Sequence, residues 1–176
     1  YAPREYFDRY PLDQIRLPAT LEGDLDDVPP IARRITLFGG EHARILSNDA
    51  WREAVQGYLA NISFADDCLG HVLAALDSSP HRDNTIIVLW SDHGWHLGEK
   101  EHWKKWTLWE EATRNILLFA GPGIPRAGRR ATTPVSLLDI YPTLIDLCAL
   151  SPKPELEGVS LLPLLDDPER AVHPAP

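Results

Sequence analysis

Two short, wholly apolar runs constrain the fold most: Thr85 to Trp90 (TIIVLW) and Ile116 to Ala120 (ILLFA). Each is rich in β-branched or large apolar residues and is bordered by turn-forming residues, which is typical of a central strand buried on both faces. Helical periodicity precedes and follows both runs. Such alternation predicts an α/β fold with helices on both faces of a sheet.

The longest helical pattern covers residues 49–77, where apolar side chains recur every three or four positions. Asn48 or Asp49 is expected to cap its start, because a short polar side chain accepts the unpaired amide bonds there. Further helices are expected near Ile31 to Phe38, over 108–114 and over Pro134 to Leu150. The pattern of the long helix rests on Trp51, Val55, Tyr58, Ile62, Ala65, Leu69, Val72 and Leu76.

The chain divides by composition into three parts. Residues 1–48 are rich in proline and acidic residues and are predicted to be mostly irregular, as befits a functional or covering loop. Residues 49–165 form the predicted α/β core segment. Residues 166–176 are a tail, and the region from Ser151 onward is expected to be loop around the apolar SLLPLL.

Charge and cysteine content exclude some functions. A formal net charge of −9 argues against a nucleic-acid partner. No apolar stretch approaches the roughly 20 residues that cross a bilayer, so no membrane association is expected. Cys68 and Cys148 both lie in apolar helical patterns. This favours buried free thiols, although one disulfide stays open.

A polar stretch with many ligand-type side chains, SDHGWHLGEKEHWKKW, follows the first apolar run directly. Ligands of α/β proteins bind beyond the carboxyl ends of strands, where Asp92 and His93 are expected. Asp92 either ligates a cation or closes the strand with an Asx-type turn. His93 either ligates the metal or bonds within the loop. Gly94 permits a sharp exit and a close backbone approach.

The same stretch carries two adjacent lysines beside aromatic residues. Lys104 and Lys105 are either solvated or held where one of them meets an anion. The tryptophans at 103, 106 and 109 are expected to serve packing more than ligand stacking. His96 and His102 are weaker candidates for site residues.

The segment SDHGWHLGEKEHWKKWTLWEEATR resembles type I sulfatases of the alkaline-phosphatase-like superfamily, in particular the iduronate-sulfatase and choline-sulfatase branch. The segments LANISFADDCLGHVLAALD, TIIVLWSDHG, LLDIYPTLIDLC and LEGVSLLPLL follow the family pattern in order, and PREYFDRYPLDQIRLP resembles that branch as well. The resemblance therefore covers nearly the whole chain.

The resemblance implies part of a three-layer α/β/α sandwich, with residues 1–176 as a C-terminal part of the catalytic domain. It matches Asp92 and His93 to the family's calcium-ligand pair, and Lys105, thirteen positions after Asp92, to the lysine that contacts sulfate. Lys104 does not fall at that spacing. Because calcium prefers oxygen, His93 is the weaker ligand and could border the metal instead.

The implied reaction is hydrolysis of a sulfate ester by a formylglycine made from Cys or Ser. The family motif reads Cys or Ser, any residue, Pro, any residue, Arg; Cys68 and Cys148 do not fit it. Ser78 to Arg82 (SSPHR) fits, but it precedes the strand that Asp92 follows. Thr85 to Ser91 extends over roughly 23 Å at about 3.3 Å per residue, so SSPHR is expected to be a turn. The nucleophile and the first aspartate ligands are expected upstream of Tyr1, which leaves this chain inactive alone.

Two other functions stay open: a phosphate or phosphonate ester hydrolase of the same superfamily, and a non-catalytic cation-binding module. One departure from the family pattern is Asn115-Ile116 after Arg114, where Val-Pro is usual. The resemblance favours a periplasmic, secreted or lysosomal-type compartment and leaves a cytoplasmic one open. The sequence assigns neither the sulfated alcohol, whether a small molecule or a glycan, nor the oligomeric state.

Overall fold

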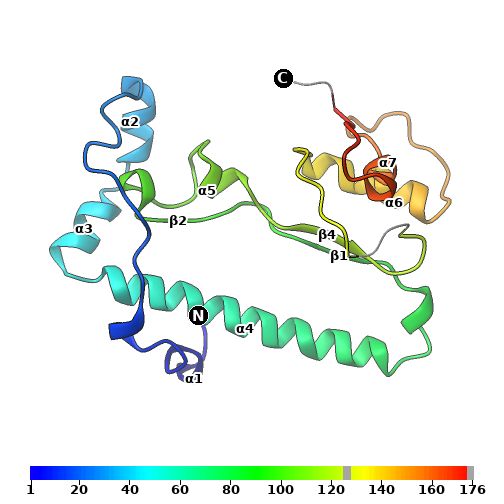
Figure 1. Ribbon diagram of the computed structural model, residues 1–176, viewed down its shortest axis with the longest axis horizontal. Helices are drawn as coiled ribbons and strands as arrows, with labels where there is room; N and C mark the ends of the chain where they lie inside the picture. The colour runs from blue at the N-terminus through cyan, green and yellow to red at the C-terminus, as the bar shows by residue number, and fades with distance from the viewer. Residues whose placement is uncertain (125–127, 174–176) are drawn as a thin grey trace. The chain divides into compact units, whose positions relative to one another are not determined.

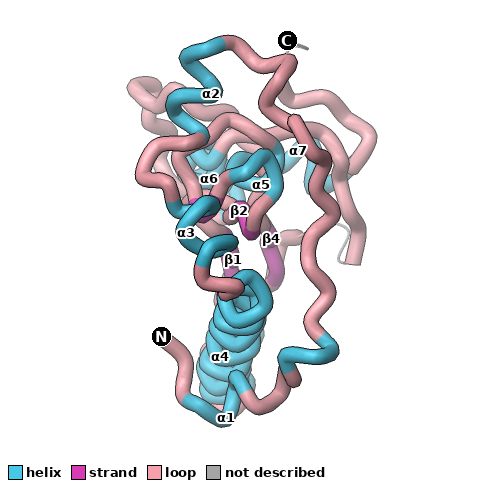
Figure 2. The backbone as a smooth tube through the Cα atoms, turned by 90° about the vertical axis from the view of Figure 1, so that its left-hand side faces the viewer, coloured by secondary structure: helices cyan, strands magenta, loops and turns pink. Residues whose placement is uncertain are grey.

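The computed structural model describes residues 1–124 and 128–173 and contains two compact units. The first consists of Tyr1–Pro80 and His93–Ile116, and the second of His81–Asp92 and Leu117–Pro176. Figure 1 labels the elements along the chain, and Figure 2 shows that helices and loops make up most of it, with little strand. Among the described helices, none combines the length and the apolar character that crossing a membrane requires.

The first unit is built along the long helix α4 (Trp51–Asp77), which confirms the predicted amphipathic helix. The predicted cap is wrong: Ala50 is the N-cap residue and makes no side-chain bond there, while Asp49 has a left-handed φ of 51°. Val55 and Ala60 are buried on α4, whereas Ile62 and Val72 stay exposed in the described chain. Only part of the predicted apolar face is therefore covered within this unit.

The region 1–48 contains more helix than the sequence predicts. The helix expected near Ile31 to Phe38 is present as α2 (Pro30–Thr36) and begins with a proline, which suits the first turn. The helices α1 (Arg4–Phe7) and α3 (Glu41–Ser47), and the 3₁₀ turn η1 (Leu12–Gln14), were not expected. Helix α1 packs against α4, where Tyr6 meets Phe64 edge to face.

Residues 93–116 add a small sheet and two short helical elements to the first unit. Strands β2 (His96–Leu97) and β3 (Trp103–Lys104) pair antiparallel, with His96 opposite Lys104. The 3₁₀ turn η3 (Glu99–Glu101) joins them. The expected helix over 108–114 is the single turn α5 (Glu110–Thr113).

In the second unit, both predicted strands are present: β1 (Ile87–Trp90) and β4 (Leu117–Ala120), after the 3₁₀ turn η2 (Arg82–Asn84). They pair antiparallel, with Ile87 opposite Ala120 and Trp90 opposite Leu117. The predicted burial on both faces is wrong for the described chain, since Trp90 is 50% exposed and Leu118 43%. In the described residues β1 pairs with β4 alone, so one narrow sheet cannot bury its own faces.

The helix predicted over Pro134 to Leu150 is the 3₁₀ turn η4 (Leu137–Asp139) followed by α6 (Ile140–Leu147). Ser136 and Asp139 form a capping box at its start. The SLLPLL segment, expected to be loop, forms α7 (Leu162–Asp166), again with a proline in the first turn.

Asp139 is fully buried and joins these segments. Its carboxylate accepts hydrogen bonds from the backbone N–H groups of Ser136 (2.8 Å) and Val159 (2.9 Å), and lies 2.6 Å from His173 Nε2. Burial alone would raise the pKa of Asp139, but the bond from His173 and the two backbone bonds outweigh burial and lower it. The second unit thus contains a buried, ionised carboxylate that links the segments around Ser136, Val159 and His173.

Both cysteines are free, as expected, but they are exposed and not buried. Cys68 lies on a part of α4 that the first unit leaves uncovered, and Cys148 is the C-cap residue of α6. The periodicity that placed them on helices was correct. It could not show which helical faces are covered.

Candidate functional site

Gly94 fixes the backbone where the polar stretch begins. Its N–H donates to the carbonyl oxygen of Ala112 at 2.7 Å. A Cβ at this position would lie 2.0 Å from the carbonyl oxygen of Glu111. Only glycine allows this approach to α5, which confirms the predicted role of the residue.

The predicted metal ligands, Asp92 and His93, directly precede Gly94. Asp92 is exposed and follows β1 after one residue. The Nδ1 atom of His93 lies 2.7 Å from the carbonyl oxygen of Gly94. Because a carbonyl only accepts, Nδ1 carries the hydrogen, and a neutral ring then has its lone pair at Nε2. This tautomer is the one that a metal ligand requires.

Aromatic stacking holds the His93 ring. It stacks on Trp95, with ring centroids 6.2 Å apart, and Trp95 stacks on Tyr58 of α4 at 6.1 Å. The orientation of His93 is therefore set by packing as well as by its hydrogen bond to Gly94.

Asp92 and His93 do not complete a metal site by themselves. Within residues 1–124 and 128–173, no group of three or more His, Cys, Asp or Glu side chains converges to hold a metal ion. The carboxylate of Asp92 suits a hard cation, and the His93 ring nitrogen suits calcium less well. The pair fits as part of a ligand set, and its role as such stays a prediction.

The two adjacent lysines have different surroundings. Lys104 forms an ion pair with Glu41 at the start of α3. In the described part of the chain, no salt bridge involves Lys105, which is half-buried with its Nζ 5.7 Å from the Trp106 ring centre. Among the described residues, Lys104 thus has a carboxylate partner and Lys105 has none.

The three tryptophans differ as well. Trp103 is buried, donates from Nε1 to His42 Nδ1 at 3.1 Å, and meets Trp51 edge to face. Trp109 is half-buried and meets His96 edge to face. Packing is confirmed for these two and is wrong for Trp106, which is 79% exposed and contacts Lys105 through a cation–π interaction.

His96 and His102, weak candidates in the sequence, are both buried, and each contacts a residue of the 105–107 segment. His102 contacts the backbone carbonyl of Lys105 itself, and His96 contacts Thr107. The three-residue spacing of His102 and Lys105 is a sequence signal for such a contact. It is a weak one, because it does not show that the intervening backbone turns back on itself.

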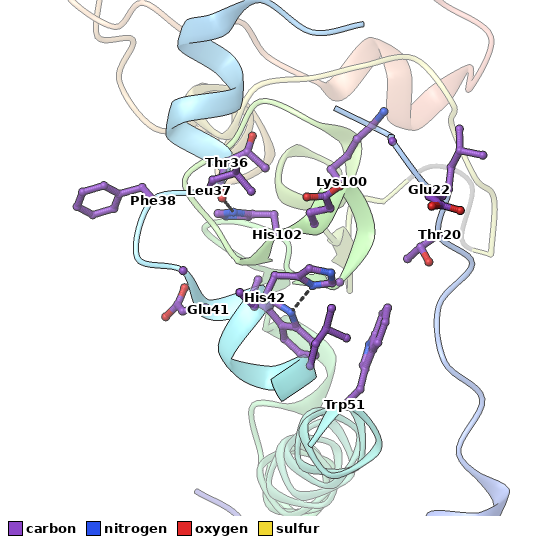
Figure 3. A pocket seen from close by; sticks show the side chains of 18 residues that line it. Thr20, Glu22, Thr36, Leu37, Phe38, Glu41, His42, Trp51, Lys100 and His102 are labelled. Atoms are coloured by element: carbon purple, nitrogen blue, oxygen red, sulfur yellow. Dashed lines mark hydrogen bonds between the residues drawn. The ribbon is translucent and has the colours of Figure 1, made fainter. Parts of the chain in front are cut away.

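In the first unit, His102 also lines a pocket of about 790 Å³. Figure 3 shows its labelled lining residues, which come from the 20–22 segment, the end of α2 and the residues after it, the starts of α3 and α4, and the turn at Lys100 to His102. Burial lowers the pKa of His42, although Glu101 opposes the shift, and the hydrogen bond to Asp24 raises the pKa of Lys100. Neutral imidazole at His42 matches its role as acceptor from Trp103.

The segment SSPHR is a turn, as expected. It follows the C-terminal end of α4, and η2 begins at its Arg82. The whole of β1 separates it from Asp92 in the chain. Along the chain, Ser78 and Ser79 therefore precede β1, whereas the predicted metal ligands follow it.

The chain is similar to known sulfatases over almost its whole length. The family model described as sulfatase matches residues 2–150. Identity is 43% to a sulfatase of Formosa agariphila, over 96% of this chain and 34% of that protein. It is 35% to a choline-sulfatase of Rhizobium meliloti (96% and 33%) and 32% to an iduronate 2-sulfatase of Mus musculus (86% and 34%). The chain thus spans about a third of the length of these relatives.

Several solved structures also match the fold of this chain. A phosphonate monoester hydrolase from Silicibacter pomeroyi matches with a TM-score of 0.81 at 24% identity, over 98% of this chain and 36% of that one. Another, from Agrobacterium radiobacter, gives 0.79 at 25%, over 96% and 36%. A protein solved with its substrate D-glucosamine-2-N,6-O-disulfate gives 0.63 at 30%, over 67% and 24%. The likeness to the first of these concerns the fold alone.

Proposed function

Because the chain belongs to the sulfatase family, we propose that the whole protein is a calcium-dependent sulfatase, which hydrolyses sulfate esters. The observation that carries the proposal is the match of the family model over residues 2–150, together with 43% identity to a sulfatase along 96% of the chain. The relatives named choline-sulfatase and iduronate 2-sulfatase support a sulfate ester of a small alcohol or of a glycan as the substrate class.

Lys105 is the proposed sulfate contact. Its charge has no carboxylate partner among the described residues, and the exposed ring of Trp106 lies beside it. A fixed ammonium group stabilises the negative charge that develops on oxygen as the bond between sulfur and the alcohol breaks. Lys105 therefore serves both binding and catalysis in this proposal.

Asp92 and His93 are the proposed contribution of this chain to the calcium site. The Asp92 carboxylate supplies a hard oxygen ligand, and His93 either supplies Nε2 or borders the metal. When bound, calcium would supply positive charge that offsets the charge of the sulfate group. The remaining ligands have to come from other residues of the protein, since the described ones form no group of three.

The nucleophile is proposed to be a formylglycine in a segment that precedes Tyr1. Neither cysteine of this chain lies in the family motif, and SSPHR is a turn at the far end of β1. Residues 1–176 alone are therefore expected to be inactive. In the whole protein we expect the β1–β4 pair to belong to a larger three-layer α/β/α sandwich, whose other elements cover Trp90 and Leu118.

Two lysine variants of the full-length protein test the assignment of the sulfate contact. Lys105→Ala is expected to lower kcat/KM for 4-nitrophenyl sulfate by about 100-fold or more, as loss of a transition-state donor does. Lys104→Ala, the matched control, removes the same charge next to it and should have a far smaller effect. Equal losses for the two variants would show that Lys105 is not the lysine that contacts sulfate.

The metal assignment is tested separately. Asp92→Ala in the full-length protein should abolish the dependence of activity on added calcium after chelation. If the variant keeps both its activity and its calcium dependence, Asp92 is not a ligand. Purified residues 1–176 should hydrolyse the same ester no faster than buffer does, and clear turnover would overturn the proposal of a nucleophile outside this chain.

A second candidate is a phosphate or phosphonate ester hydrolase. It is favoured by the fold match to two phosphonate monoester hydrolases, the closer in identity at 25% with a TM-score of 0.79. Parallel rates on phenyl sulfate and a phenyl phosphonate, with metal analysis of the purified protein, separate the two. A preference for the phosphonate would replace the first proposal. Absence of turnover of either ester, with one cation bound, would indicate a non-catalytic cation-binding module.

A further inference from the structure

Resting on the proposed sulfatase activity, we propose that His102 is a positioning residue for Lys105. In this proposal His102 acts through the backbone of the lysine and touches no substrate. It ties the carbonyl group of Lys105 to the C-terminal residue of α2. His96 supports the same segment through the hydroxyl of Thr107.

The segment that carries Lys105 adopts a conformation that needs support. Lys104 and Trp106, which flank it, have φ values of 68° and 80°. Residues with a Cβ rarely adopt this left-handed region, and they persist there when the surrounding structure enforces it. The pairing of β3 with β2 ends at Lys104, so the sheet does not hold Lys105.

The side chain of His102 contacts the backbone of Lys105 and supports it there. The side chain is only 5% exposed, and its two ring nitrogens face two carbonyl groups: Nδ1 lies 2.6 Å from Thr36 O, and Nε2 lies 2.6 Å from Lys105 O. Both oxygens only accept, so the two contacts are hydrogen bonds at the same time when both ring nitrogens carry a hydrogen, that is, in the imidazolium form of His102. The contact at Nε2 fixes the peptide group that directly follows the Cα atom of Lys105.

His96 holds the next residues. It is fully buried, with Nδ1 3.2 Å from Glu99 O and Nε2 2.7 Å from Thr107 Oγ1. The Glu99 carbonyl requires the hydrogen at Nδ1, so Nε2 accepts from the Thr107 hydroxyl. Burial lowers the pKa of His96, which favours this neutral form. His96 also packs edge to face on His102, with ring centroids 5.1 Å apart.

The two histidines therefore hold the 105–107 segment through Lys105 O and the Thr107 hydroxyl, without taking part in chemistry. All four ring nitrogens face protein atoms, which leaves none to bind a ligand or to transfer a proton to substrate. The position of Lys105 is thus coupled directly to His102.

Two substitutions of His102 separate positioning from stability. The amide nitrogen of asparagine replaces Nδ1, so His102→Asn keeps a donor for Thr36 and loses the bond to Lys105. The amide nitrogen of glutamine reaches the position of Nε2, so His102→Gln keeps the donor for Lys105. In the full-length protein, His102→Asn should lower kcat/KM for 4-nitrophenyl sulfate by about 10- to 100-fold, as expected for a misplaced catalytic group. His102→Gln should restore most of this loss, although both variants lose one bond.

A double variant tests whether His102 acts through Lys105. If it does, His102→Asn combined with Lys105→Ala is no slower than Lys105→Ala alone, because the positioned group is already gone. Equal losses for the Asn and Gln variants, or fully additive losses in the double variant, would overturn the proposal. A wild-type protein without turnover of the sulfate ester would instead overturn the proposed function.

If His102→Asn does not fold, Thr107→Val tests the same support from the side of His96. The control is Thr113→Val, which removes a hydroxyl that, among the described residues, donates to Trp109 O at the start of α5. Thr107→Val is expected to lower kcat/KM at least about 5-fold relative to this control, at unchanged far-UV circular dichroism. Equal activity of the two threonine variants would refute the inference.

Discussion

Gly94→Ala is the substitution for which the structure gives the clearest magnitude. The new Cβ would lie 2.0 Å from Glu111 O, whereas real Cβ atoms essentially never approach another heavy atom within 3.0 Å. The backbone must therefore separate by at least 1.0 Å, the difference of these two distances. The opposing atom belongs to the backbone of α5, so a side-chain rotation cannot relieve the contact.

This displacement has two expected effects. It breaks the 2.7 Å bond from Gly94 N–H to Ala112 O, and with the overpacking it should destabilise the protein by about 1–3 kcal/mol. It also moves the chain next to His93, and a shift of about 1 Å in a catalytic group lowers activity on the order of 100-fold. We therefore expect a functional loss that exceeds what partial unfolding explains.

The assay compares kcat/KM for 4-nitrophenyl sulfate with the midpoint of urea unfolding, both in the full-length protein. Gly70→Ala is the matched control: Gly70 lies within α4 and a Cβ there meets no atom within 4 Å. Alanine should stabilise this helix by up to about 1 kcal/mol and leave activity unchanged. Wild-type activity and stability in Gly94→Ala would refute the reasoning that the turn requires glycine.

Other predictions concern the second unit and the thiols. Asp139→Asn should destabilise the second unit by about 2–4 kcal/mol in urea unfolding at pH 7, because one amide oxygen replaces a buried carboxylate that accepts several hydrogen bonds. The control Asp146→Asn, on the exposed side of α6, should hardly change the free energy of unfolding. The folded pKa of Asp139 lies below its ordinary 3.8, mainly through the bond from His173 against the opposing effect of burial. The ionised carboxylate therefore stabilises the unit at neutral pH, and this stabilisation is lost as the pH falls below about 4. The free energies of unfolding of the wild type and Asp139→Asn should become equal in acid. In residues 1–176, Cys68 and Cys148 should both react promptly with a thiol reagent without denaturant, and a slow second equivalent would contradict their exposure.

Periodicity and local chemistry predicted much of the fold. The 49–77 pattern marks α4, and the two apolar runs mark β1 and β4, because the apolar side chains of these segments repeat with the period of their structure. The short helices α1, α3 and α7 were missed, since segments of four to seven residues carry too few repeats to show a period. Capping at Asn48 or Asp49 was wrong, because Ala50 starts the helix and no side chain caps it.

The candidate site was predictable to a different depth. Spacing and resemblance chose Lys105 over Lys104, and the structure gives a physical reason for the distinction in the ion pair of Lys104 with Glu41. Composition could not find that pair, because its partners are 63 residues apart. For the same reason the role of His102 was not visible: its bond to Thr36 spans 66 residues.

The bond between His102 and Thr36 has a consequence for how variants of this protein are interpreted. Through His102, Thr36 at the C-terminal end of α2 helps to hold Lys105, although the two residues are far apart in the sequence. Substitutions that shift α2 would then appear in a mutational scan as catalytic defects with intact expression. A scan that scores only the polar stretch 91–106 would miss this second set of sensitive positions.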